Sequence, residues 1–227
     1  MMTDLSNWQP RPRPERIVLE GRYVRLEPLS AAEHGDGLYE ASTVADAAER
    51  FRWLPDFPPE SRAAFQPWLD KAEASGDPLF FAVIDNASGK IAGRQTLMRI
   101  DAANGVMEIG NIYWGPLVSR KPAATEAHFL FMQYAFDGLG YRRWEWKCNN
   151  RNEPSKRAAE RFGFSFEGIF RQHMIVKGEN RDTAWYSILD KEWPAVKQAY
   201  EGWLDPGNFD SDGNQKRRLE DFRKSLE

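Results

Sequence analysis

The chain is poor in cysteine, and Cys148 is the only one among its 227 residues. No internal disulfide can form, which fits a reducing compartment, so we expect a cytoplasmic protein. Long apolar runs are missing as well, because the strongest one, "LFFAVI" at 79–84, has only the length of a strand. A membrane span needs about 20 apolar residues and a leader needs an apolar core, so we expect neither.

The chain also lacks the spacings that mark metal and nucleotide chemistry. Its three histidines, His34, His128 and His173, are scattered, and no H-x-x-x-H or paired-cysteine pattern occurs. We therefore expect no metal site. No P-loop or G-x-G-x-x-G stretch indicates nucleotide hydrolysis or a dinucleotide. The net charge of -3 gives no reason to expect nucleic acid, and acids surround the basic run at 216–218, which is typical of a solvated helical face.

The order of apolar patterns predicts one α/β (α+β) domain. Several strands come first, followed by strand, helix, strand, helix and a closing pair of strands. This order indicates a single mixed, partly parallel central sheet flanked by helices. We place that domain at 17–204, after a polar, proline-rich arm at 1–16 and before a charged C-terminal tail at 205–227 that we expect to be loosely attached.

Local signals place the main elements. "SAAE" from Ser30 is a capping-box pattern that predicts a helix start. Gly163 is expected to end a short helix that has Pro154 in its first turn. Strands are predicted at 22–29, 79–85, 91–100, 106–115 and 141–149, and a last hairpin at 165–178 and 182–189 with its turn at 179–181.

The stretch "SRKPAATEA" at 119–127 can be an anion-binding turn or a plain helix start. Pro122 suits the first helical position, which needs no N–H. The N–H groups that follow have no partner inside the helix, and they form a positive, donor-rich pocket next to two cations. On the anion-binding interpretation, the residues that contact a phosphate are Arg120, Lys121, Ala123, Ala124 and Thr125.

Four patterns follow one another along the chain, and their order and spacing are informative. They are "EIG" at 108–110, "PAATEA" opening a helix, a strand, and "NEPSKRAAERFGFSFEG" at 152–168. This series resembles the GNAT acetyltransferases, and most of all the branch of the ribosomal-protein N-acetyltransferases. That family's Q/R-x-x-G-x-G/A motif, followed in this branch by "TEA", aligns with Ser119, Pro122 and Ala124. Its second half aligns with Asn152, Ser155 and Gly163-Phe164. The resemblance covers roughly residues 17–190.

The resemblance implies an acetyl-CoA-dependent N-acetyltransferase with no covalent enzyme intermediate. Its acceptor would be a primary amine, on a small amine, an aminoacyl compound or a protein N-terminus. The pyrophosphate would bind the turn from Arg120 to Thr125, and the pantetheine arm would pair with the backbone of Ile112, Tyr113 and Trp114. Asn152 can cap its helix, hold a pantetheine amide, or do both. Pro122 offers no N–H and Ser119 is short, so a non-catalytic acyl-CoA-binding or regulatory module of the same fold stays an alternative.

The catalytic groups follow from the same resemblance. Many relatives use a tyrosine to protonate the leaving thiolate, but that position is Ala159 here. In the resembling branch a serine does so, and Ser155 matches it, although a surface serine in a first helical turn is equally ordinary. Glu108 is our first candidate for the base, ahead of His173 and Glu167. Direct transfer needs no enzyme nucleophile, so Cys148 is expected to be a core thiol.

Acceptor recognition is expected from the segment near "ERFRWLPDFPP" at 49–59. Phe51 and Trp53 can wall a substrate pocket there or pack on the core. Asp182 can bind a cationic amine or pair with Arg181. Exposed strand edges make a homodimer a further expectation.

Overall fold

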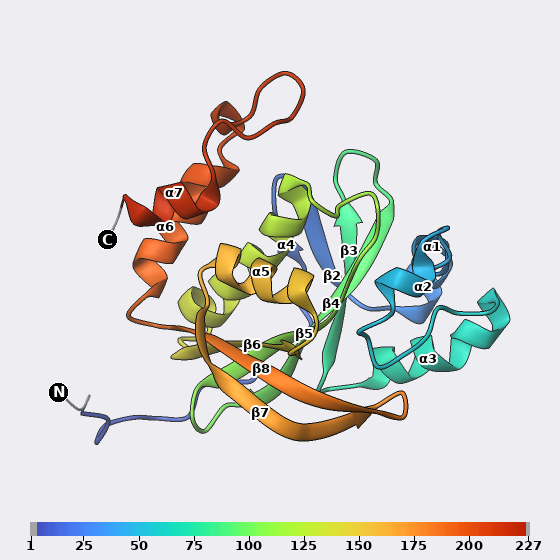
Figure 1. The fold of residues 1–227 in the computed structure, drawn as a ribbon, viewed down its shortest axis with the longest axis horizontal. Helices are drawn as coiled ribbons and strands as arrows, with labels where there is room; N and C mark the ends of the chain where they lie inside the picture. The colour runs from blue at the N-terminus through green and yellow to red at the C-terminus, as the bar shows by residue number, and fades with distance from the viewer. Residues whose placement is uncertain (1–3, 226–227) are drawn as a thin grey trace.

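The computed structural model describes residues 4–225, which build an eight-stranded sheet with helices on both faces (Figure 1). The strand order is β1-β2-β3-β4-β5-β6-β8-β7, and neighbouring strands are antiparallel except for the parallel pair β5–β6. The predicted mixed, partly parallel sheet is confirmed. The strands are β1 (Leu19–Glu20), β2 (Val24–Pro28), β3 (Leu79–Asp85), β4 (Ile91–Asp101), β5 (Val106–Trp114), β6 (Arg143–Asn149), β7 (Ser165–Val176) and β8 (Glu179–Leu189).

Two groups of helices cover the two faces, and β3 shows the division. Phe81 packs edge-on against Phe131 of α4, while its neighbour Phe80 points the other way and packs against Trp68 of α3. The helices are α1 (Ala31–Ser42), α2 (Ala47–Arg50), α3 (Arg62–Ala74), α4 (Pro122–Gln133), a π-helical turn (Tyr134–Gly138), α5 (Glu153–Phe162), α6 (Trp193–Leu204), a 3₁₀ turn η2 (Pro206–Asn208) and α7 (Leu219–Lys224).

The helix ends follow the predicted signals. Ser30 caps α1 by accepting the Glu33 N–H at 3.3 Å, but Glu33 does not return the bond; the Ser30 N–H donates instead to His34 Nδ1 at 3.0 Å. Pro122 opens α4 at its first turn. Gly163 ends α5 with a left-handed φ of 98°, which glycine adopts without the strain that a Cβ brings.

The predicted turn of the last hairpin is wrong. β7 runs to Val176 and β8 begins at Glu179, and these two residues pair with each other. The turn is Lys177–Gly178, with φ values of 51° and 78°. A two-residue turn with both φ values positive matches the twist of the strands it joins, and it is preferred over the longer loop that the polar "ENR" indicated.

The tail is not loosely attached in its described part, 205–225. Leu219 of α7 is fully buried, and Arg223 Nη2 donates to the Glu160 carbonyl of α5 at 3.0 Å. Asn208 ties the segment together through bonds to the carbonyls of Trp203 and Arg217, both at 3.1 Å. The many charges of this segment conceal the apolar side chains that pack on the core, Phe209, Leu219 and Phe222, which is why its composition suggested a free tail. The division into arm, domain and tail remains a prediction.

A buried histidine joins four elements on the α4 face. His128 of α4 accepts the Trp144 indole N–H from β6 at 3.1 Å, and its other ring nitrogen lies 3.0 Å from the Tyr200 hydroxyl of α6. Tyr200 in turn donates to the Phe162 carbonyl of α5 at 3.2 Å. Burial, followed by the charge of Arg161, lowers the pKa of His128 to about 3, so the ring is neutral in the folded protein.

This histidine should make the fold sensitive to acid. The folded pKa lies below the ordinary 6.5, so between those two values the unfolded chain binds a proton that the folded chain does not. Stability therefore falls as the pH falls through this window, by about 2 kcal/mol between about pH 7 and 5. Glutamine keeps one donor and one acceptor but does not titrate. Urea unfolding at the two pH values should therefore show that His128→Gln lacks the part of the pH-dependent loss of stability that His128 causes. Equal losses in both proteins would contradict the assignment.

Candidate active site

The parallel strands β5 and β6 are paired over only half their length. The ladder runs from Val106–Arg143 to Ile109–Trp146, and the strands then separate. The register with β4 shifts just beyond this point, where Asn111 has a left-handed φ of 47° in a β-bulge. A cleft of about 480 Å³ opens at the split. In the described chain, β5 has no strand partner on this side from residue 110 onward, so its backbone can pair with an extended amide chain.

The three residues predicted to hold pantetheine lie at this split. Ile112 and Trp114 line the cleft, and the Trp114 indole is fixed by donating to Gln95 Oε1 at 3.1 Å. The Tyr113 side chain points away, because its hydroxyl donates to the Ala41 carbonyl and its ring packs on Phe51. Only the backbone of Tyr113 can therefore contribute to the cleft.

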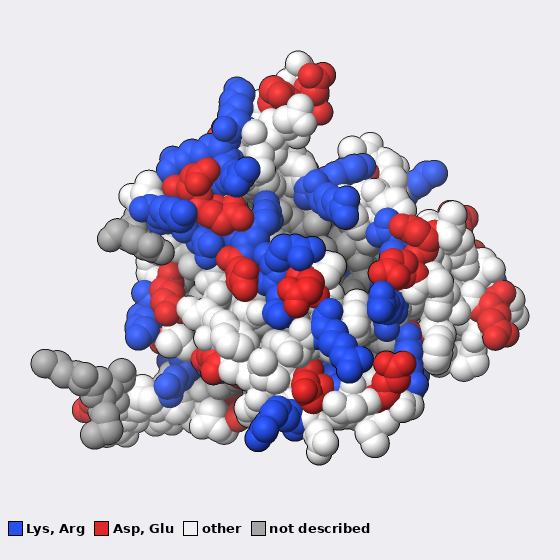
Figure 2. Space-filling view, viewed as in Figure 1, with Lys and Arg blue, Asp and Glu red and all other residues white. Residues whose placement is uncertain are grey.

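A second and larger cavity, about 1080 Å³, continues from the cleft along the start of α4. The two share Trp114 as a common wall. Of the predicted phosphate contacts, Arg120, Lys121, Ala124 and Thr125 line this cavity. Ala123 is buried in the core instead. Figure 2 shows basic side chains gathered over α5, α6 and α7 on this face, with acidic ones between them.

The backbone donors of the turn are only partly free. The Ala124 N–H bonds to the Lys121 carbonyl at 3.2 Å, and the Lys121 N–H bonds to Val118 at 3.1 Å. The N–H groups of Arg120 and Ala123 have no backbone partner in the described chain. Arg120 holds a left-handed φ of 62°, which is strained for a side chain of this kind. A phosphate at this turn would thus meet these two N–H groups and the two exposed cations.

Sequence reasoning missed the residues that close this cavity from both ends. Arg50 Nη1 donates to the Trp114 carbonyl and to Ser119 Oγ, both at 3.1 Å, and so ties α2 to the turn. The opposite wall comes from the C-terminal segment through Trp203, Phe209, Gly213, Asn214 and Gln215. No short motif marks these residues, since they reach the cavity only because α6 and α7 pack against α5.

Ser155 and Asn152 meet in the cleft at the start of α5. Asn152 caps the helix by accepting the Ser155 N–H at 3.2 Å, which confirms the capping role and leaves its amide donors for a ligand. Ser155 Oγ accepts the Trp146 indole N–H at 3.0 Å, so its own hydrogen is free to donate. Cys148 is buried in the core and also lines the cleft. Burial raises the pKa of its thiol.

Glu108 lies at the other end of the cleft among cations. Its Oε2 is 2.9 Å from Lys147 Nζ and 3.3 Å from Arg99 Nε. Burial raises the pKa of Glu108, and the charges of Lys147 and Arg99 oppose that rise. Lys147 also contacts Glu145 Oε2 at 2.6 Å, and Arg181 lines the same cleft. Three cations thus surround the candidate base, a grouping that spans three strands and that no local pattern indicated.

The two alternative bases are not among the residues that line the cleft. His173 Nδ1 lies 2.9 Å from Thr183 Oγ1, and burial lowers the pKa of its ring. Glu167 forms two bonds with Arg143 and accepts the Ser187 hydroxyl at 2.7 Å, so its pKa is lowered. Both side chains lie outside the cleft lining, whereas Glu108 is part of it.

The structure separates the predicted acceptor residues. Trp53 lines the cleft. Phe51 is buried against Tyr113 and does not line it, which is the core packing we allowed for. Asp182 is half-buried and accepts the Gln172 N–H at 2.7 Å, while Arg181 donates to Thr183 instead of pairing with Asp182. The cleft lining does not include Asp182.

Among residues 4–225, Glu27, Glu33 and His34 place ligand-type atoms within 4.8 Å of one another. His34 is already used at the start of α1: it accepts the Ser30 N–H, and its Nε2 lies 2.9 Å from Glu27 Oε2. The cluster is therefore explained by helix capping. The helices of the described residues are all too short or too polar to cross a bilayer.

The chain matches the acetyltransferase (GNAT) domain over residues 24–165. A crystal structure of a GCN5-related N-acetyltransferase from Brucella melitensis is 72% identical, covers 97% of this chain and 100% of its own, and superposes with a TM-score of 0.96. The chain therefore belongs to the GNAT acetyltransferases, as the motifs indicated.

Two curated Bacillus proteins are also similar. One from B. subtilis, named "Putative ribosomal N-acetyltransferase YdaF", is 34% identical over 110 residues, which are 48% of this chain and 59% of that protein. The other, N-acetyltransferase p20 of B. licheniformis, is 30% identical over 117 residues, 50% of this chain and 63% of its own. The matched region thus spans less than two thirds of either relative. A neighbour of the same fold, the acetyltransferase MccE crystallised in complex with acetyl-CoA and AMP, has 21% identity and a TM-score of 0.65; the match covers 74% of this chain and 93% of MccE.

Proposed function

We propose that this chain is an N-acetyltransferase that moves an acetyl group from acetyl-CoA directly to a primary amine. One observation carries the proposal: the split between β5 and β6 is continuous with a large cavity at the positive start of α4. A long donor that is anionic at one end and amide-bearing at the other fits this path. The complex of MccE with acetyl-CoA supports the choice of donor. The acceptor class is a small amine, an aminoacyl compound or a protein N-terminus.

Each residue that lines the cleft has a separate role in the proposed acetyl transfer. Acetyl-CoA would supply an activated thioester, whose C–S bond breaks as the amine nitrogen forms a C–N bond; the nitrogen gives up one proton and the sulfur takes one. Arg99, Lys147 and Arg181 would disfavour an ammonium ion beside them and so favour the neutral, nucleophilic amine. Glu108 would receive the proton from nitrogen, and the free Ser155 hydrogen would serve the leaving sulfur.

The proposed binding mode is tested by calorimetric titration of acetyl-CoA. Arg120→Glu/Lys121→Glu changes two exposed cations of the turn and should weaken binding about 100-fold, because the turn would then repel phosphate. Lys90→Glu/Lys191→Glu reverses two exposed lysines elsewhere and should bind like the parent. If the folded parent does not bind acetyl-CoA, the proposed enzyme and an acyl-CoA-binding module are both ruled out, and the non-catalytic alternative remains as a regulatory module in which Pro122 marks a lost site. If it binds but acetylates no amine, the non-catalytic alternative stands.

Ser155→Ala should reduce kcat about 100-fold and leave the KM for acetyl-CoA nearly unchanged, because a general acid acts in the transition state. The exposed Ser165→Ala is the matched control. Steady-state kinetics at saturating amine measures both. A rise in KM with constant kcat would instead show that Ser155 only binds the donor.

We extend the proposal to a cytoplasmic location, which the free and buried Cys148 supports, and to a homodimer. The support for a dimer is the edge strand β7, which exposes four large apolar side chains: Phe166, Ile169, Phe170 and Ile175. A second copy could pair with this edge. Sedimentation of the parent and of Ile175→Glu, whose wild-type side chain is 82% exposed, tests it. A parent that stays monomeric rules the dimer out.

A further inference from the structure

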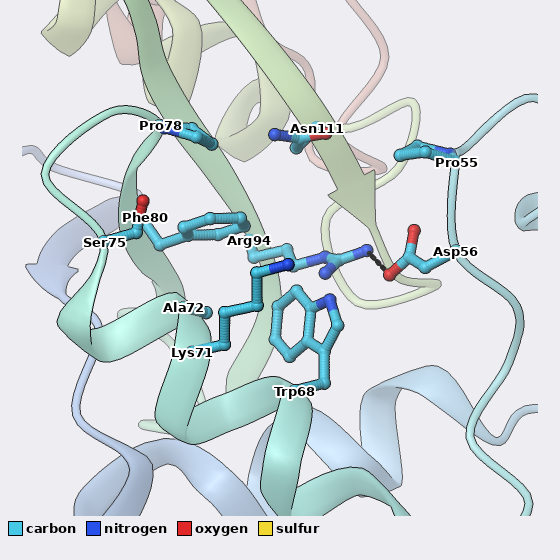
Figure 3. A pocket seen from close by; sticks show the side chains of 10 residues that line it. All are labelled: Pro55, Asp56, Trp68, Lys71, Ala72, Ser75, Pro78, Phe80, Arg94 and Asn111. Carbon is cyan, nitrogen blue, oxygen red and sulfur yellow. Dashed lines mark hydrogen bonds and ion pairs between the residues drawn. The ribbon is translucent and has the colours of Figure 1, made fainter.

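A separate cavity of about 320 Å³ lies on the other face of the sheet, between α3 and strands β3 to β5 (Figure 3). Its walls are mostly apolar. Trp68 of α3 and Phe80 of β3 meet edge to face, with ring centroids 5.4 Å apart, and Pro55 and Pro78 complete the apolar lining. A flat or branched apolar group would fit against these walls.

Arg94 brings a charge into this apolar setting. Its side chain is 3% exposed, and its guanidinium carbon lies 4.1 Å from the centre of the Trp68 ring (Figure 3). Arginine has five N–H donors, yet the structure gives it one side-chain hydrogen bond, from Nη2 to Asp56 Oδ2 at 2.6 Å. Arg94 Nε and Asp56 Oδ1 are both buried with no partner among the described residues. An unpaired buried donor is costly, so Arg94 Nε points to a missing acceptor.

The charge of the cavity is not balanced by the chain itself. Lys71 of α3 also lines it and reaches toward Arg94 (Figure 3), so two cations face the single carboxylate of Asp56. The guanidinium fork of arginine matches a carboxylate in shape as well as in charge. Surroundings of low polarity strengthen that attraction. The group that complements this cavity is therefore a carboxylate carried on an apolar body.

The cavity adjoins the cleft where transfer is proposed to occur. Pro55 and Asn111 line both of them, and Asn111 is the bulge residue of β5. We infer that this cavity is the acceptor subsite, and that the acceptor is a primary amine whose far end is a carboxylate on an aromatic or branched apolar spacer. Arg94 and Lys71 bind the carboxylate while the amine lies in the cleft. The cavity can be tested by itself; the assignment of its ligand as the acceptor rests on the proposed acetyl transfer.

Binding without any acetyl donor tests the cavity first. Calorimetric titration of the full chain with 3-phenylpropionate and with its neutral amide should show the acid binding about 10-fold tighter. Arg94→Gln/Asp56→Asn removes both charges of the buried pair and keeps a polar amide at each position, and it should abolish this preference. Circular dichroism confirms that the double variant is folded. Equal affinity for acid and amide, or no binding of either by the parent, overturns the subsite.

Turnover then tests the role of the subsite in the reaction. The parent should acetylate 4-(2-aminoethyl)benzoate with a kcat/KM about 10-fold above that of 2-phenylethylamine. Lys71→Gln should reduce this ratio, and Lys90→Gln, which changes another exposed lysine away from the cavity, should not. Equal rates for the two amines would overturn the acceptor assignment and leave the proposed acetyl transfer intact. If acetyl-CoA is not used at all, the acetyl transfer fails, while the titration with 3-phenylpropionate still decides the cavity.

Discussion

Glu126→Ala should cost about 4 kcal/mol of unfolding free energy, because one buried carboxylate of α4 holds the turn between β1 and β2. Its two oxygens accept the N–H groups of Arg22 at 2.9 Å, Tyr23 at 2.5 Å and Val24 at 2.9 Å. Gly21 is needed here because a Cβ at that position would lie 2.5 Å from Glu126 Oε2. Alanine would leave all three donors without an acceptor in a mostly buried place.

Urea unfolding of Glu126→Ala measures this loss. Glu40→Ala, an exposed change within α1, is the control and should stay within about 0.5 kcal/mol of the parent. Glu126→Gln keeps one acceptor oxygen and should fall between the two variants. The prediction would be wrong if Glu126→Ala unfolded at the same urea concentration as the control, because water would then satisfy the three N–H groups as well as the carboxylate does.

Lys147→Met should destabilise the protein by about 3 kcal/mol at neutral pH, because two buried carboxylates lose their shared cation and each keeps only one arginine, Arg99 for Glu108 and Arg143 for Glu145. Glu108 and Glu145 lie 2.9 and 2.6 Å from Lys147 Nζ, and the three side chains are at most 9% exposed. The ammonium group also lies 3.8 Å from the centre of the Trp185 ring. Methionine keeps the stem of the side chain in place, so the loss is that of the charge.

Two further measurements separate charge from packing in this cluster. Adding Glu108→Gln to Lys147→Met should recover part of the loss, since the buried carboxylate that Arg99 alone would then balance is gone. The defect of Lys147→Met should also shrink as the pH falls, because burial already raises the pKa of Glu108 and loss of the cation raises it further. A defect that is independent of pH, and that Glu108→Gln does not relieve, would assign the loss to packing.

Local signals predicted most of the fold because they act within a few residues. The Ser30 cap, Pro122 at the start of α4, the Asn152 cap and Gly163 at the end of α5 all occur where the sequence placed them. The family motifs singled out Ser155 and the turn at the start of α4, and the structure places these in two adjoining cavities. The two caps depend on hydrogen bonds between near neighbours in the chain, while Pro122 and Gly163 act through the backbone angles that each residue favours.

The rest of the site depends on contacts that no short pattern encodes. Arg94 meets Asp56 across 38 positions of sequence, and Lys147 meets Glu108 only because β5 and β6 are parallel neighbours. The bulge at Asn111 is carried by a residue other than glycine, so no local signal marked it. The C-terminal wall of the large cavity was concealed because a few buried side chains, such as Leu219, are outnumbered by charges.

The cations around the split between β5 and β6 should make the binding of anionic ligands depend strongly on ionic strength. Arg99, Lys147 and Arg181 line the cleft, while Arg120 and Lys121 line the cavity beside it. Their joint field extends over a Debye length, about 10 Å at 0.1 M salt, and it draws anions toward the split. Rates of capture for an anionic donor or acceptor should therefore fall steeply as salt is added. Phosphate or sulfate in the buffer would compete for the same positions, so a weakly coordinating buffer of low ionic strength is where activity should be greatest.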